Sequence, residues 1–119
     1  LSGGQRRRGA LATVLACRPD ILVLDEPSAN LDPVARRELA QTLADLPQTM
    51  LVVTHDLPYA AQLCDRAVIV DDGHIVADGP IAEILCDAEL LAAHRLELPW
   101  GFDAEVLLAA RTGADRAHT

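Results

Sequence analysis

Residues 21–26 have the sequence ILVLDE, a short apolar run that ends in two carboxylates. Such a run is too short for a helix, and it is apolar on both faces. This pattern is typical of an interior strand of a parallel sheet, with layers of structure covering both of its sides. The sequence therefore predicts that Asp25 and Glu26 lie at the carboxyl end of a buried strand.

The segments that follow this strand predict a βαβ unit. Asp32 and Pro33 form a helix start, with Asp at the N-cap and Pro at the first helical position. The helix is expected to end at Pro47, and residues 50–53, MLVV, form a second strand of the buried type. Both parallel strands end at the same edge of the sheet, where ligands of open α/β sheets bind. His55 follows the second strand, so we expect it close to the two carboxylates.

The rest of the chain predicts helices and a hairpin, which together with the βαβ unit indicate an α/β fold. Ser2 and Gln5 have the spacing of a capping box at the start of a helix. An Asp-Gly pair at residues 72–73 lies between two short apolar runs, residues 67–70 and 75–77, and predicts a β-hairpin with these runs as its strands. Helices are then expected near residues 81–85, 88–95 and 104–111.

The composition excludes some classes of function. The chain has 119 residues, a formal net charge of −8 and 10 basic residues, all of them arginine. Binders of nucleic acids or of anionic membranes usually present a basic surface, so neither partner is expected. Without lysine, the chain has no Gly-rich phosphate loop that ends in Gly-Lys-Ser/Thr. We interpret the only basic run, residues 6–8, as a solvated helix face; contact with a phosphate or a partner is the alternative.

Cysteine content and hydropathy favour a cytosolic protein. Cys17, Cys64 and Cys86 are odd in number and lack the spacing of metal ligands, which is typical of reduced thiols. No apolar stretch approaches the roughly 20 residues that span a bilayer. The first residue is Leu rather than Met, so we expect a chain that is truncated at its start.

Four short motifs occur in order along the chain: LSGGQ at 1–5, LDE at 24–26, SANLD at 28–32 and VTHD at 53–56. In this order they resemble the signature, Walker B, D-loop and switch-histidine motifs of ATP-binding cassette (ABC) ATPases. The resemblance covers about residues 1–85 and implies the C-terminal part of a P-loop NTPase fold: parallel strands with a crossover helix, then a hairpin and C-terminal helices. It implies a partial ABC ATPase domain over residues 1–93 and a C-terminal tail over residues 94–119.

Two carboxylates and a histidine are the candidate groups for hydrolysis. Mg²⁺ prefers oxygen ligands and keeps several waters, so Asp25 suits holding the hydrated ion that accompanies ATP. Glu26 is then placed to orient or deprotonate the attacking water, and His55 resembles the switch histidine, which contacts the terminal phosphate. Taken singly, these residues have plainer interpretations, as carboxylates facing solvent and as a capping histidine.

The glycine-rich helix start is the candidate nucleotide contact. A bare helix start attracts anions through its free amides and its positive end. The resemblance implies that this start serves the ATP held by a second ABC ATPase subunit in a head-to-tail dimer, and that the D-loop crosses the same interface. The candidate nucleotide-binding residues are Ser2, Gly3, Gly4, Gln5 and Asp32.

The later part of the chain indicates a type of transporter. Residues 78–99 resemble the ATPases of energy-coupling-factor importers for cobalt or nickel, and ATPases of other ABC importers or exporters are the alternative. Such proteins bind transmembrane transporter subunits at the cytoplasmic side of the cell membrane. The family's phosphate loop, adenine-stacking aromatic residue and glutamine loop precede its signature and have no counterpart here. We therefore expect this polypeptide alone to bind ATP weakly or not at all and not to turn it over; a non-catalytic interaction module is the second function considered.

Overall fold

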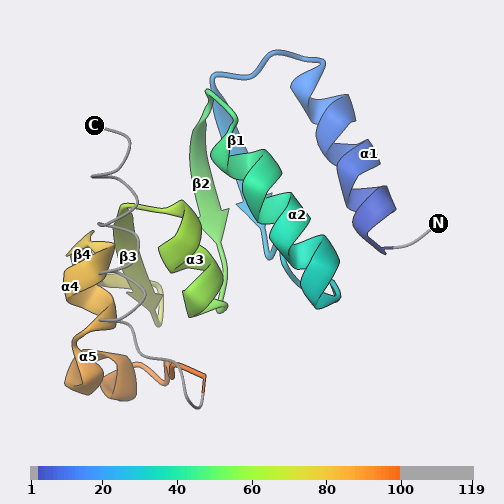
Figure 1. Ribbon diagram of the computed structural model, residues 1–119. Coiled ribbons are helices and arrows are strands. Elements are labelled where there is room, and N and C mark those ends of the chain that lie inside the picture. The colour runs from blue at the N-terminus through green and yellow to red at the C-terminus, as the bar shows by residue number, and fades with distance from the viewer. Residues whose placement is uncertain (1–2, 100–119) are drawn as a thin grey trace, which may run out of the picture. The chain divides into compact units, whose positions relative to one another are not determined.

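The computed structural model describes residues 3–99, and the chain divides into two compact units, Leu1–Asp56 and Leu57–Thr119. The predicted boundary between residues 93 and 94 stays a prediction. Figure 1 shows the helices and strands in chain order. In the first unit these are α1 (Gly3–Leu15), β1 (Ile21–Asp25), α2 (Pro33–Ala44) and β2 (Thr49–Val53).

The first unit contains the predicted βαβ arrangement. β1 and β2 pair in parallel, with Ile21 opposite Thr49 and Asp25 opposite Val53. The two strands therefore end at the same edge, as the sequence predicted. The Asp32 carboxylate accepts a hydrogen bond of 2.8 Å from the Ala35 amide, so the predicted N-cap of α2 is confirmed.

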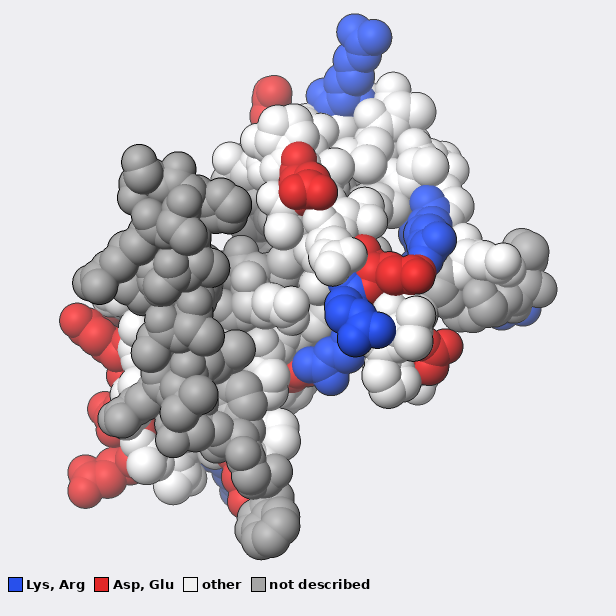
Figure 2. Space-filling model, in the orientation of Figure 1, with Lys and Arg blue, Asp and Glu red and all other residues white. Residues whose placement is uncertain are grey.

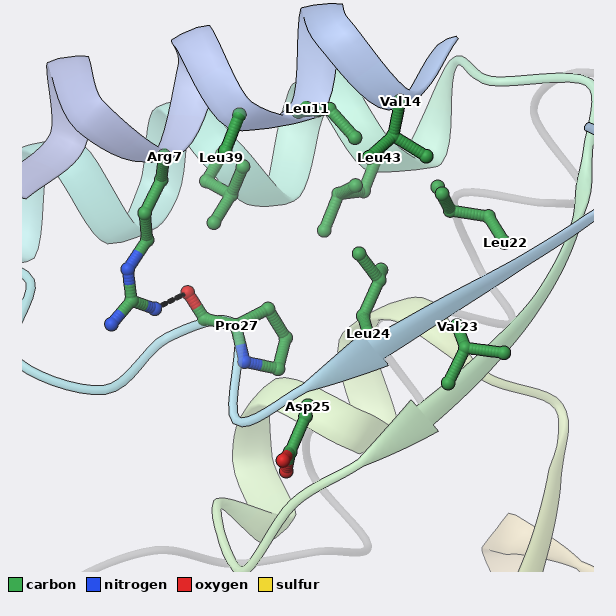
Figure 3. Close-up of a pocket in the computed structure, with 11 residues that line it drawn as sticks. Arg7, Leu11, Val14, Leu22, Val23, Leu24, Asp25, Pro27, Leu39 and Leu43 are labelled. Carbon is green, nitrogen blue, oxygen red and sulfur yellow. Dashed lines mark hydrogen bonds between the residues drawn. The ribbon is translucent and has the colours of Figure 1, made fainter. Parts of the chain in front are cut away.

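The helices of this unit pack on one face of the two-stranded sheet. Leu22 and Leu24 point toward α1 and α2, whereas Val23 and Asp25 point to the other face (Figure 3). Leu22 is only 3% exposed, but Val23 is 61% exposed. The remaining exposed apolar side chains of the two strands are Ile21, Leu51 and Val53. The prediction that both faces are covered is therefore wrong within the described residues, because one face lacks a packed layer.

The second unit contains α3 (Leu57–Leu63), β3 (Arg66–Asp71), β4 (His74–Pro80), α4 (Ile81–Leu85) and α5 (Ala88–Ala93). Among the described residues of this unit, a core cluster contains seven buried apolar residues: Leu57, Ala61, Ile69, Ile81, Ile84, Leu85 and Leu91. The helix predicted over 104–111 lies outside the described residues.

The hairpin of the second unit confirms the Asp-Gly prediction. Its strands β3 and β4 are antiparallel, and the turn residues Asp72 and Gly73 have φ angles of 50° and 74°. Positive φ at both central turn positions matches the twist of a two-residue hairpin, and Gly adopts it at little cost. The strands are longer than predicted, because the pairing continues until Arg66 lies opposite Pro80.

The surface of the described residues carries both signs of charge. On the face shown in Figure 2, Arg side chains and Asp or Glu side chains are interspersed. Exposed ion pairs join Arg8 to Glu38 and Arg66 to Asp78. None of the helices in residues 3–99 is long and apolar enough to span a membrane, and in this part of the chain Cys17, Cys64 and Cys86 form no disulfide.

Candidate functional site

The site lies where β1 and β2 end, entirely within the first unit. The Glu26 amide donates a hydrogen bond of 2.7 Å to the Val53 carbonyl, which extends the strand pairing one residue beyond Asp25. The side chain of Glu26 is thereby brought next to Thr54 and His55. The predicted approach of Glu26 and His55 at one sheet edge is confirmed.

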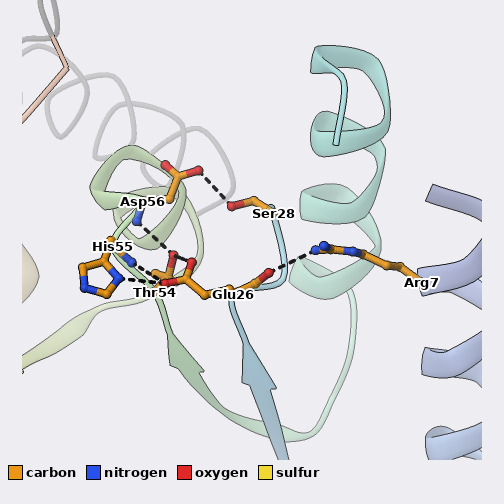
Figure 4. A network of polar contacts seen from close by, with 6 residues as sticks. All are labelled: Arg7, Glu26, Ser28, Thr54, His55 and Asp56. Carbon is orange, nitrogen blue, oxygen red and sulfur yellow. Dashed lines mark hydrogen bonds and ion pairs between the residues drawn. The ribbon is translucent and has the colours of Figure 1, made fainter. Parts of the chain in front are cut away.

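Three groups hold the Glu26 carboxylate (Figure 4). Its Oε2 accepts a hydrogen bond of 2.9 Å from the Thr54 hydroxyl. Its Oε1 accepts one of 3.0 Å from the His55 amide and lies 2.9 Å from His55 Nδ1. The Thr54 hydroxyl in turn accepts from the Asp56 amide at 2.9 Å. The carboxylate is therefore fixed in position from two sides.

These contacts also keep Glu26 ionised. The hydrogen bond from the His55 side chain is the largest cause of a lowered pKa for Glu26; burial opposes it, and the Thr54 hydroxyl and the His55 amide add to it. A carboxylate oxygen can accept about two hydrogen bonds. Because Oε1 already has two His55 contacts and Oε2 has only Thr54, Oε2 is the atom that can accept a hydrogen bond from a water.

The His55 ring is open to a ligand. Its side chain is 89% exposed, against 36% for that of Glu26. With Nδ1 directed at the carboxylate, Nε2 faces away from it and can meet a second group. Both ring nitrogens donate hydrogen bonds only in the charged imidazolium, so in that form His55 can bridge Glu26 and an anion.

Asp25 lies next to Glu26 in sequence but is placed differently. Its side chain points to the sheet face opposite Leu24 and is exposed (Figure 3). No described residue donates a hydrogen bond to its carboxylate. In residues 3–99 no group of three or more Asp, Glu, His or Cys residues is arranged to hold a metal. Mg²⁺ in nucleotide sites is usually held by one or two carboxylates, with substrate phosphates and waters, and a single open carboxylate fits that requirement.

The candidate nucleotide contacts fall into two groups. Gln5 and Asp32 line one open cavity of about 520 Å³ between the start of α1 and the start of α2, together with Arg8, Pro33, Val34, Ala35 and Glu38. Gly3 and Gly4 are the first residues of α1, and Ser2 lies outside the described residues. The structure thus brings Gln5 and Asp32 to one surface.

The loop that follows Glu26 is held by residues that sequence reasoning missed. Arg7 of α1 donates hydrogen bonds to the carbonyl oxygens of Glu26, at 3.0 Å, and of Pro27 and Ala29. The interpretation of residues 6–8 as a solvated face is therefore wrong for Arg7, and its partners are carbonyl groups rather than a phosphate. A signal was present: Leu11 and Val14 lie four and seven positions after Arg7, so helical spacing puts all three on one face.

A second set of contacts joins this loop to the end of β2. The Ser28 hydroxyl donates a hydrogen bond of 2.8 Å to one carboxylate oxygen of Asp56 (Figure 4), and the Arg36 guanidinium donates one of 2.7 Å to the other. The Asp56 carboxylate therefore links the D-loop-like segment, α2 and the segment after β2.

The chain is similar to several known proteins. A family model described as "AAA domain, putative AbiEii toxin, Type IV TA system" matches residues 1–61. A putative ABC transporter ATP-binding protein of Streptomyces coelicolor is 64% identical over 110 residues, which are 92% of this chain and 42% of the relative. The energy-coupling factor transporter ATP-binding protein EcfA2 of Latilactobacillus sakei is 44% identical over 103 residues, 83% of this chain and 35% of the relative.

A solved structure gives a similar result. CbiO1 from Clostridium perfringens, described as part of the ABC transporter complex cbiONQ, is 34% identical and superimposes with a TM-score of 0.66. The match covers 83% of this chain and 41% of that chain. The chain thus spans about two-fifths of the length of the relatives it matches.

Proposed function

This chain belongs to the AAA-domain family, and the proteins it is similar to include ABC transporter ATP-binding proteins; from that premise we propose that it supplies the hydrolytic site of a transporter ATPase. The observation that carries the proposal is the Glu26 carboxylate, held by Thr54 and His55 where two parallel strands end. The reaction is hydrolysis of ATP to ADP and phosphate. Its energy would drive the movement of a solute across the membrane.

Glu26 and His55 are the proposed catalytic residues. The free acceptor position on Glu26 Oε2 would receive a hydrogen bond from the attacking water and orient it, and Glu26 would take up the proton that the water loses. His55 would use its exposed Nε2 to contact the terminal phosphate. A positioned base contributes typically about 10²–10⁴-fold to a rate. Asp25 would hold Mg²⁺, which neutralises charge on the phosphates when bound.

The start of α1 and the start of α2 are proposed to meet the ATP of a second subunit. Gln5 and Asp32 line one surface cavity, which supports a shared role. Ser2, Gly3 and Gly4 would contribute from the helix start, where free amides and the positive helix end favour phosphate. The partner is a second ABC ATPase subunit in a head-to-tail dimer.

We further propose an import system of the energy-coupling-factor type, for cobalt or nickel. The similarity to EcfA2 and to cbiO1 supports this type, although the 64% identical relative carries no such description. The ATPase would bind transmembrane transporter subunits at the cytoplasmic side of the cell membrane.

The test is ATP turnover by a full-length protein that carries this segment. Glu26→Gln keeps the shape of the side chain but removes its charge and basicity, so kcat should fall by roughly 10²–10⁴-fold. Glu83→Gln, an exposed residue of the first turn of α4, is the matched control and should leave kcat unchanged. The 119-residue chain alone has no lysine and no phosphate loop, and it should be inactive in the same assay. Turnover by Glu26→Gln close to that of the unaltered protein would show that the assignment of Glu26 is wrong.

A further inference from the structure

One arginine of α1 fastens the backbone that carries Glu26. The Arg7 Nη1 donates to the carbonyl oxygens of Glu26 and Pro27, and its Nη2 donates to that of Ala29. Figure 4 shows the Arg7 side chain extending from α1 to the backbone of Glu26. Its partners are thus consecutive parts of one loop, and the three bonds cross 19 to 22 residues of sequence.

The loop adopts a backbone conformation that needs such support. Glu26 and Asn30 have φ angles of 46° and 62°, in the left-handed region that residues other than Gly rarely adopt. Such conformations persist when the surroundings hold them, and they are common at functional sites. Within the loop, two backbone bonds close the bend: the Ala29 amide donates to the Glu26 carbonyl at 3.1 Å, and the Leu31 amide donates to the Ser28 carbonyl at 3.4 Å. Arg7 donates three more hydrogen bonds to this loop, and their acceptors are carbonyl oxygens that lie outside any strand or helix.

We propose that Arg7 is a positioning residue that sets the location of the Glu26 carboxylate for hydrolysis. The inference rests on the proposed function of Glu26. The planar guanidinium suits this task because its donors form a rigid fork that reaches several acceptors at once, whereas a lysine ammonium is a compact point charge on a flexible stem. Through Arg7, the same helix that begins with Gly3 and Gln5 is joined to the hydrolytic loop.

Arg7 acts on position and not on the charge state of Glu26. Its contacts are with backbone oxygens, and the lowered pKa of Glu26 has its causes in His55 and Thr54. Loss of Arg7 should therefore reduce the rate of the chemical step without moving the acid limb of its pH profile. A misplacement of about 1 Å can cost on the order of 10²-fold in rate.

The experiment uses the full-length protein that carries this segment, with Arg7→Met, Arg7→Lys and the exposed neighbour Arg6→Met as the matched control. Arg7→Met should lower kcat for ATP hydrolysis by between about tenfold and 10²-fold. The KM for ATP and the acid limb of the pH profile should stay unchanged. Arg7→Lys should recover part of kcat, and Arg6→Met should behave as the unaltered protein. Hydrogen exchange of the Ala29 amide should be faster in Arg7→Met, which reports the loosened loop without relying on activity.

Separate outcomes overturn the inference and the proposed function. A kcat within twofold of the unaltered protein for Arg7→Met, with Glu26→Gln inactive, would overturn the role of Arg7 alone. Both Arg7 variants could instead lose activity only because fewer molecules are folded. If kcat per folded molecule were normal in both, the role of Arg7 would also be overturned. If Glu26→Gln itself retained full turnover, the proposed function would fail, and the role of Arg7 with it.

Discussion

Glu26 is fixed through its backbone and through its carboxylate. Its amide continues the pairing of β1 with β2, its carbonyl accepts from Arg7, and its carboxylate accepts from Thr54 and His55. A positive φ of 46° at this residue turns the chain away from the strand direction. The cost of such a conformation is of order 1–3 kcal/mol, and these hydrogen bonds offset it.

The His55 contact makes a prediction about protonation. His55→Ala removes the largest cause of the lowered Glu26 pKa, so this pKa should rise toward 4.5. Because the folded-state pKa is below the unfolded one, the contribution of Glu26 to stability is present above about pH 4.5 and is lost as the pH falls through the folded pKa. An NMR titration of the Glu26 carboxyl carbon measures the shift. His74→Ala, at the start of β4, is the control and should leave the Glu26 pKa unchanged. Equal Glu26 pKa values in His55→Ala and the unaltered protein would contradict the prediction.

At the scale of elements, α2 depends on its first residues. Asp32 accepts from the Ala35 amide and Pro33 occupies the first helical position. Asp32→Ala should lower the free energy of unfolding by about 1 kcal/mol, because an N-cap acceptor is lost. Urea denaturation measures the change. Asp32→Asn keeps a capping oxygen and should be nearly neutral, so equal losses in the two variants would rule out the capping role.

The elements of this chain could be predicted where local chemistry decides them. The Asp-Pro start of α2 and the Asp-Gly turn at residues 72–73 carry strong local signals, and both were predicted correctly. The end of β4 was placed too early, because pairing between Arg66 and Pro80 is a property of two strands together. Similarly, a run of three arginines is typical of a solvated helix face. Only Arg7 has helical spacing to the apolar residues Leu11 and Val14, and this spacing distinguishes it from the other two arginines.

The site shows the same division between local and long-range information. The approach of Glu26 and His55 follows from the rule that parallel strands end at one edge, so it could be predicted. The bonds from Arg7 to the loop, and from Ser28 and Arg36 to Asp56, join segments 19 to 28 residues apart and depend on packing. Sequence patterns carry little information on such contacts.

At the scale of the whole molecule, one apolar sheet face is open. Ile21 and Val23 of β1 and Leu51 and Val53 of β2 are each at least 50% exposed. Apolar residues on both sides of a strand indicate that both sides suit burial, and here α1 and α2 cover only the side of Leu22 and Leu24 (Figure 3). This open face suits burial against a further layer of structure, and the relatives that the chain matches are longer than it.

The most direct test is a crystal structure of a full-length protein that carries this segment, grown with Mg²⁺ and a non-hydrolysable ATP analogue. We predict that the terminal phosphate lies at the edge where β1 and β2 end, with Glu26 Oε2 facing a water beside it and the Asp25 carboxylate directed at the metal. A nucleotide bound elsewhere, or Asp25, Glu26 and His55 all directed away from the terminal phosphate, would contradict the proposed hydrolytic site.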